Sequence, residues 1–266
     1  MTSRAWLVPS AGLAALLAFA FLGPLVFAVD PTAIDLAHTF AGHSLAHPLG
    51  TDENGRDVLA RLMVGGRSTL AVGVSASVVA LLAGTAIGSL TATGHRWLDT
   101  ATSRLLDAAM AIPSFFLLLV IVTLFGASIS TLVIAIGATT WVGIARLVRA
   151  ETLSLREREF VVAARALGAP AGDIIRRHVL AHLRPTLVAA MGVGLSQAVL
   201  TESVLSFLGL GIQPPRPSWG NMLTGARATL LGAPWLAVYP GIAIVVAVLC
   251  CNALIERFRD SPLGNR

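Results

Sequence analysis

The stretch TLAVGVSASVVALLAGTAIGSLTAT, Thr69–Thr93, contains no charged side chain. A transmembrane α-helix needs about 20 consecutive, mostly apolar residues to cross the hydrocarbon core of a bilayer, which is about 30 Å thick. This stretch therefore predicts a membrane-spanning helix. Gly84 and Gly88 lie four residues apart within it, a spacing of small residues that lets helices approach closely in lipid.

Five more apolar stretches along the chain have the same character. Together with the first, the predicted spans are Ala5–Val29, Thr69–Thr93, Leu105–Phe125, Ser130–Val148, Thr186–Leu208 and Leu236–Ile255. The composition agrees, because 55% of the residues are hydrophobic and only 12% are charged, whereas a soluble domain has about 25% charged residues. We therefore predict an all-α membrane protein with six transmembrane helices.

The first span ends in Val26-Phe-Ala28, which has the small-residue spacing of a signal-peptidase site. However, its apolar stretch is longer than the hydrophobic region of a signal peptide, which has roughly 7–15 residues, and only Arg4 precedes it. We interpret it as a retained anchor. The predicted organisation is an N-terminal anchor (residues 1–30), an external loop with an amphipathic segment (31–68), a five-helix core (69–256) that contains a cytoplasmic loop (150–185), and a tail (257–266).

The arginines predict the orientation of the chain, because cytoplasmic loops of membrane proteins carry an excess of basic residues. Fourteen of the 19 arginines fall in the N-terminus, the 94–104 connection, the 146–184 segment and the C-terminal tail, and the other five fall in the alternate connections. Both termini and the 146–184 segment are therefore predicted to be cytoplasmic. The same distribution explains the net charge of +5 without any nucleic-acid partner.

The chain contains no lysine. A phosphate-binding P-loop needs a lysine that reaches the phosphates, so we do not expect this chain to bind ATP in that way. Its two cysteines, Cys250 and Cys251, are adjacent within an apolar run and are interpreted as buried side chains. His178 and His182 have a spacing that can bind zinc, but no third ligand stands nearby, so no metal site is expected.

The cytoplasmic loop has the pattern of a helical hairpin. Glu157–Leu167 is a helical stretch that ends before Gly168, and Pro170 can begin a second helix with Asp173 in its first turn. Apolar residues then recur at helical spacing from Ile174 to Leu183. Such a hairpin suits docking to another protein, and the alternative is an amphipathic loop that lies on the lipid headgroups.

Four ordered stretches resemble a known family. They are EFVVAARALG (159–168) followed by IIRRHVL (174–180), HPLGTDENGRDVL (47–59), LSFLGLG (205–211) followed by QPP (213–215), and APW (233–235) followed by PG (240–241). The first resembles the EAA loop of ABC-importer permeases, and the set is similar to the C-type permease subunit of the dipeptide, oligopeptide and nickel subfamily. Two positions differ: Val162 stands where the general motif has glutamate, and Ala181 stands where the subfamily usually has proline.

The resemblance implies a type I ABC-importer permease fold whose EAA loop is a coupling helix hairpin seated on an ATPase subunit. The residues that it implies in coupling are Glu159, Ala163, Ala164, Arg165, Gly168, Asp173, Arg176 and Arg177. It also implies a location in the bacterial inner membrane among lipids, a second homologous permease subunit, one or two ABC ATPase subunits that bind ATP and Mg, and an extracytoplasmic solute-binding protein. This chain would hold no cofactor and would not be an enzyme by itself.

Glu202 is the clearest carboxylate within a predicted span. Ionisable residues at membrane depth are costly and usually face a bundle interior or a polar path. Two interpretations stay open for Glu202: a group that lines or gates the solute path, and a structural carboxylate hydrogen-bonded between helices.

Three functions compete for this pattern. The leading hypothesis is a subunit of an ATP-driven importer of dipeptides or oligopeptides, with nickel, haem or another solute as the alternative cargo. A self-sufficient secondary transporter would leave the cytoplasmic hairpin unexplained and would have only Glu202 as a coupling carboxylate. An intramembrane enzyme is disfavoured, because the chain contains neither an H-E-x-x-H nor a G-x-S-x-G motif.

Overall fold

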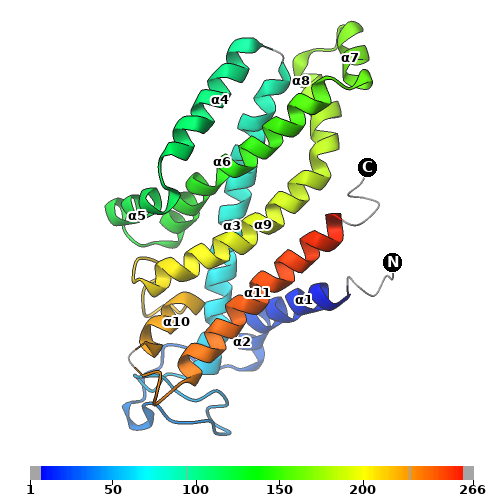
Figure 1. Ribbon diagram of the computed structural model, residues 1–266. Coiled ribbons are helices and arrows are strands. Elements are labelled where there is room, and N and C mark those ends of the chain that lie inside the picture. Colours follow the sequence, from blue (N-terminus) through cyan, green and yellow to red (C-terminus); the bar gives the residue numbers. More distant parts are fainter. Residues whose placement is uncertain (1–6, 94, 228, 260–266) are drawn as a thin grey trace.

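The computed structural model describes residues 7–93, 95–227 and 229–259, and most of them are helical (Figure 1). The helices are α1 (Leu7–Phe21), α2 (Gly23–Val26), η2 (Leu36–His38), α3 (Val58–Ser89), η3 (Leu90–Thr93), α4 (Arg96–Ala111), α5 (Ser114–Phe125), α6 (Ile129–Arg156), α7 (Glu159–Ala166), α8 (Ala171–Asp173), the π-helical η4 (Ile174–Val179), α9 (Leu180–Phe207), α10 (Trp219–Ala226) and α11 (Trp235–Arg259). Within these described ranges no strand occurs, and extended backbone pairs only in a bridge between Thr51 and Asp57.

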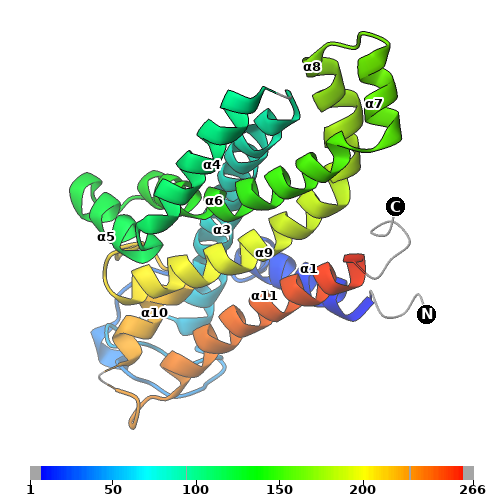
Figure 2. The same ribbon diagram turned by 45° about the horizontal axis from the view of Figure 1, so that its top comes forward.

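Five helical segments are long and apolar enough to cross a membrane. They are Val8–Val26, Val58–Ser89, Ile129–Arg156, Ala171–Phe207 and Trp235–Glu256, and the pair α4 and α5 makes a sixth if it is counted as one span. The start of α1 and the end of α11 lie side by side (Figures 1 and 2), as an even number of spans requires. A Cβ added to Gly12 of α1 would lie only 2.6 Å from the sulfur of Cys250. The prediction of an all-α, multi-pass membrane fold is therefore confirmed.

The third predicted span, Leu105–Phe125, is not one continuous helix. It is divided between α4 and α5, which meet at an angle of 78° around Ile112 and Pro113. Proline lacks the backbone N–H that would bond to the preceding turn, and its ring disfavours helical backbone at the residue before it. Ile112 accordingly adopts an extended backbone (φ −90°, ψ 121°). A broken span thus replaces the predicted straight one.

Two other helices begin well before the predicted membrane spans. The predicted boundary between residues 68 and 69 falls inside α3, whose first turns are the amphipathic segment that we expected to lie on the external surface. Asp57 caps this earlier start, because its carboxylate accepts a hydrogen bond of 2.8 Å from the N–H of Ala60. Similarly, the span predicted to begin at Thr186 continues an unbroken run of helix that starts at Ala171.

α3 is the central helix of the bundle, and α6 packs along it. α3 approaches α6 closely at Gly84 and Gly88, the two glycines whose spacing permits such a contact. A Cβ on Gly84 would lie 2.8 Å from the carbonyl oxygen of Trp141, and one on Gly88 would lie 2.6 Å from that of Ala145. These distances leave no room for a side chain, so the two backbones touch directly.

The two ends of the bundle differ in structure, as both ribbon views show (Figures 1 and 2). The hairpin end carries α7 and α8. The opposite end, which we call the loop end, carries the first loop (residues 27–57) and α10. Trp219 of α10 anchors the loop end: its side chain is fully buried, its Nε1 donates to the carbonyl of Leu62 (2.9 Å), and its main-chain N–H donates to Oγ1 of Thr69 (3.2 Å).

Candidate functional site

The hairpin between α6 and α9 turns at Gly168. The N–H of Ala169 bonds to the carbonyl of Ala164 (3.1 Å) and that of Gly168 bonds to the carbonyl of Arg165 (3.0 Å), which together form a Schellman cap at the end of α7. This cap requires a left-handed backbone, and Gly168 adopts a φ of +83°. The predicted end of the helix at Gly168 is confirmed, although α7 begins at Glu159 rather than at Glu157.

The inner face of the hairpin is packed against the chain's own helices. Val161, Ile174, Val179 and Leu183 are buried in one apolar cluster with α3 and α6. Phe160 stacks on the ring of His182, with centroids 4.6 Å apart. The hairpin is therefore fixed to the bundle by apolar contacts.

The outer face of the hairpin is open and mixed in character. Most of the coupling candidates are exposed on it (Glu159, Ala163, Arg165, Gly168, Arg176 and Arg177), and the other two, Ala164 and Asp173, are half-buried. Val162 and Leu167 add exposed apolar surface, with 50% and 89% of their area accessible. The structure therefore brings all eight predicted coupling residues together on one hairpin. The exposed position of Leu167 at the tip of the hairpin was not predicted. An apolar residue directly before a glycine that caps a helix could have indicated it.

His178 and His182 contribute to packing within the hairpin. The Nδ1 atom of His182 lies 2.6 Å from the carbonyl oxygen of His178, so the ring bonds to its own helix while its face covers Phe160. Within the described residues, no group of three or more metal-ligating side chains occurs.

Glu202 lies on α9 near the loop end and is completely buried. Its Oε1 accepts a hydrogen bond of 2.7 Å from the hydroxyl of Ser206, and that hydroxyl in turn accepts one of 2.9 Å from the N–H of Ile212. The hydroxyl groups of Thr69 and Ser218 lie beside the same carboxyl group. In this conformation Glu202 therefore sits in a pocket of hydroxyl groups between α3, α9 and α10.

The first loop is held by a buried network of charges at the loop end. Asp52 accepts hydrogen bonds from the main chain and the side chain of Arg56 (3.0 and 2.7 Å), and Nε of Arg61 lies 3.3 Å from the same carboxylate. All three side chains are less than a tenth exposed. Removing one partner of such a buried pair leaves an uncompensated charge, so the network holds the first loop rigidly. We call Asp52, Arg56 and Arg61 the clasp.

Two histidines form further hydrogen bonds within the first loop. Nδ1 of His47 lies 2.9 Å from the carboxylate of Asp57, the residue that caps α3. Nearer the surface, His38 bonds to Asp35 (2.8 Å), and this hydrogen bond lowers the pKa of the Asp35 carboxyl group.

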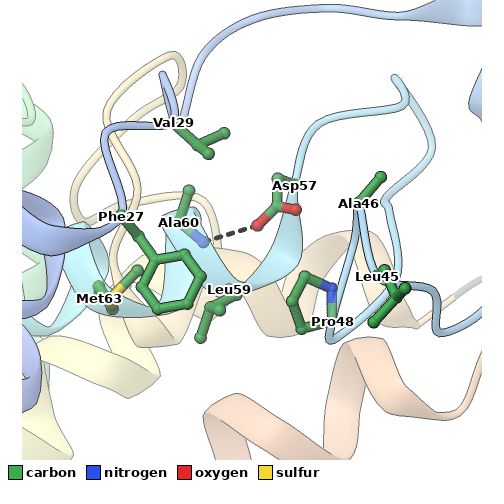
Figure 3. A pocket seen from close by; sticks show the side chains of 9 residues that line it. All are labelled: Phe27, Val29, Leu45, Ala46, Pro48, Asp57, Leu59, Ala60 and Met63. Carbon is green, nitrogen blue, oxygen red and sulfur yellow. Dashed lines mark hydrogen bonds between the residues drawn. The ribbon is translucent and has the colours of Figure 1, made fainter.

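A cavity of about 220 Å³ opens beside this clasp (Figure 3). Phe27 and Met63 line one side of it, and Leu45 and Pro48 of the first loop line the other. Its one charged group, Asp57, already bonds to Ala60 and His47. The loop end thus presents an apolar hollow on a rigid frame.

Comparison with known proteins identifies the family. Residues 84–261 match the family described as the inner membrane component of binding-protein-dependent transport systems. A putative peptide permease protein of Brucella suis is 42% identical over 259 residues, which cover 93% of this chain and 86% of the relative. The dipeptide transport system permease protein DppC of Alkalihalophilus pseudofirmus is 36% identical over 242 residues (91% and 80%), and the oligopeptide transport system permease protein OppC of Escherichia coli is 35% identical over 245 residues (91% and 81%). The chain therefore belongs to the family of inner membrane components of binding-protein-dependent transport systems.

Proposed function

We propose that this chain is one transmembrane subunit of an ATP-driven importer of peptides. The family match and the names of the three relatives, which refer to peptides, dipeptides and oligopeptides, support this cargo. In this proposal a second, homologous permease completes the solute path. A binding protein delivers the peptide at the loop end, and separate ATPase subunits hold ATP and Mg.

The hairpin supports this function best, because it combines a fixed inner face with an open outer face. Leu167 and Val162 offer apolar surface to a groove, while Arg165, Arg176 and Arg177 offer charge to acidic side chains at its rim. The small side chains of Ala163 and Ala164 permit close approach of another helix. In this proposal the hairpin is the coupling element and faces the cytoplasm, as do both termini.

The helical geometry suggests how such coupling works. The second arm of the hairpin and α9 form one unbroken helical run, Ala171–Phe207. Its 37 residues correspond to roughly 55 Å at 1.5 Å per residue. A displacement of the hairpin by an ATPase subunit is therefore carried directly into the membrane by α9. This shifts the balance between two conformations of the bundle, and no bond chemistry by this chain is required.

Reconstitution tests this function. The chain would be co-expressed with a second permease and the ATPase subunits from its own source, purified as a complex, and placed in liposomes with the binding protein and a labelled dipeptide. We expect uptake that requires ATP and the binding protein. Uptake by the chain alone without ATP, or failure to co-purify with any ATPase subunit, would contradict the proposal.

A further inference from the structure

Most polar side chains within the membrane spans bond to their own helix. Examples are the hydroxyls of Ser77, Thr140 and Ser203, which donate to the carbonyls of Gly73 (2.7 Å), Ile136 (2.7 Å) and Val199 (2.8 Å), each four residues earlier. Such bonds satisfy a hydroxyl group even where lipid surrounds the helix. A side-chain amide has two N–H donors and an acceptor oxygen, which one such bond does not satisfy, so the surroundings of the amides are more informative.

Gln197 is an exposed amide in the middle of α9. It lies 13 residues after Arg184 and 12 residues before Gly209, so it is about 20 Å from either end of the apolar stretch. Within the described residues its side chain makes no hydrogen bond. The neighbouring side chains on the exposed face of α9 are mostly apolar: Val193 and Leu200 are 56% and 38% accessible, and Thr201 donates its hydroxyl to the carbonyl of Gln197.

A second amide lies on the neighbouring helix α11. Asn252 is exposed, and its Oδ1 accepts a hydrogen bond of 3.0 Å from Ser196, the residue that precedes Gln197. Its NH₂ group has no acceptor within the described residues. α9 and α11 run next to each other in both ribbon views (Figures 1 and 2). Gln197 and Asn252, which we call the amide pair, therefore lie on neighbouring helices at a similar level of the bundle.

The amide pair does not fit a surface that faces lipid. Moving an amide from water into hydrocarbon without a hydrogen bond is strongly unfavourable, and here two amides have unused donors. Asn and Gln side chains can hydrogen-bond across an interface between membrane helices, but close interfaces of that kind are rich in small residues. The exposed face of α9 instead carries Val193, Leu200, Val204 and Phe207. We therefore favour water, or a solute that replaces water, as the partner of the two amides.

We propose that the amide pair lines the solute path and hydrogen-bonds to the main-chain amide groups of a passing peptide. This rests on the function proposed above. A side-chain amide offers two donors and an acceptor, which match the N–H and C=O of a peptide group. The contact recognises only the main-chain amide groups, which all peptides share, while the surrounding valine and leucine side chains accept varied side chains of the peptide. Because neither amide carries a charge, the contact is weak enough for release.

Cysteine labelling tests the location of the amide pair within the reconstituted complex. Cys250 and Cys251 are first replaced by alanine, and Gln197→Cys and Asn252→Cys are made in that background. Leu82→Cys is the matched control, because Leu82 is a 66% exposed apolar residue on a different helix, α3. We expect a charged, water-soluble thiol reagent to modify both test cysteines at least tenfold faster than the control, and saturating peptide with ATP to slow this reaction.

Two outcomes would overturn the proposal. Labelling of the test cysteines as slow as that of Leu82→Cys would place the pair in lipid. Disulfide crosslinks to the partner permease, without protection by peptide, would place it in the subunit interface.

Uptake kinetics give a second test, which also separates this proposal from the proposed function. We expect Gln197→Leu to reduce uptake of several unrelated dipeptides by a similar factor, roughly fivefold at low concentration, which is the effect of one lost hydrogen bond. Gln197→Asn should restore part of the loss, and co-purification with the partner subunits should be unchanged. If the Gln197→Leu variant took up peptides as fast as the wild type, only the proposed role of the amide pair would be overturned. Absence of peptide uptake by the wild type would overturn both proposals.

Discussion

The tip of the hairpin offers the sharpest test of coupling, because Leu167 is 89% exposed in this chain. Its side chain contributes almost nothing to the fold of the isolated subunit. Complete removal of a leucine side chain from water contributes roughly 1.5–3 kcal/mol. If Leu167 is buried in a groove of the ATPase subunit, Leu167→Ala should cost about 2 kcal/mol of docking energy. That corresponds to roughly 30-fold weaker binding, at 1.4 kcal/mol per factor of ten.

Val161 on the opposite face of α7 provides the control. It is fully buried in the apolar cluster under the hairpin, so Val161→Ala should lower the stability of the subunit by about 1–2 kcal/mol. Binding of the purified permease to its ATPase subunit would be measured for both variants, together with their thermal unfolding. Leu167→Ala should change binding without changing stability, whereas Val161→Ala should change stability first. Wild-type affinity for the ATPase in Leu167→Ala would refute docking through this face.

Three further substitutions test other parts of the structure. Gly168→Arg should abolish uptake while the protein still inserts, because a left-handed φ costs a non-glycine residue about 1–2 kcal/mol and the long side chain would block docking; normal uptake at normal abundance would contradict this. Gly84→Leu should lower the abundance of folded protein in the membrane, since its Cβ would already lie 2.8 Å from backbone of α6, and unchanged abundance would argue against that contact. Glu202→Gln should retain uptake, because an amide oxygen can still accept the hydrogen bond from Ser206, and a transport defect at normal abundance would instead support gating by the carboxylate.

The parts of the fold that were predictable are those in which a single local rule dominates. Long apolar runs become helices because lipid leaves the backbone no other hydrogen-bonding partner. The end of α7 was predictable from Gly168, because few other residues adopt the backbone that the cap requires. The close packing of α3 on α6 followed from Gly84 and Gly88 for a similar reason, since only the absence of a side chain permits it.

The parts that were missed depend on partners distant in sequence. α3 begins eleven residues before the predicted span because Asp57 caps it there and Asp52 compensates the charge of Arg61, and no hydropathy pattern reveals either contact. The environment of Glu202 is likewise built from distant residues, such as Thr69 and Ser218. The continuity of α8, η4 and α9 was missed only at the junction: the second hairpin helix was predicted as far as Leu183 and the span from Thr186, and the helix runs on through Arg184 and Pro185 between them.

α9 connects the hairpin, Glu202 and Gln197. Its attachment at the loop end determines how a movement of the hairpin is transmitted along the helix. Next to Glu202, Gly220 of α10 packs against the carbonyl oxygen of Ser203 with no room for a Cβ, so α9 and α10 are in direct backbone contact there. If the helical run Ala171–Phe207 moves as a rigid body about this contact at Ser203, Ala171 lies roughly 48 Å from the pivot and Gln197 only about 9 Å. A movement of the hairpin therefore reaches Gln197 reduced about fivefold, while the force on it increases by the same factor. A lever of this kind is better suited to breaking a packed contact within the membrane than to moving a side chain over a long distance.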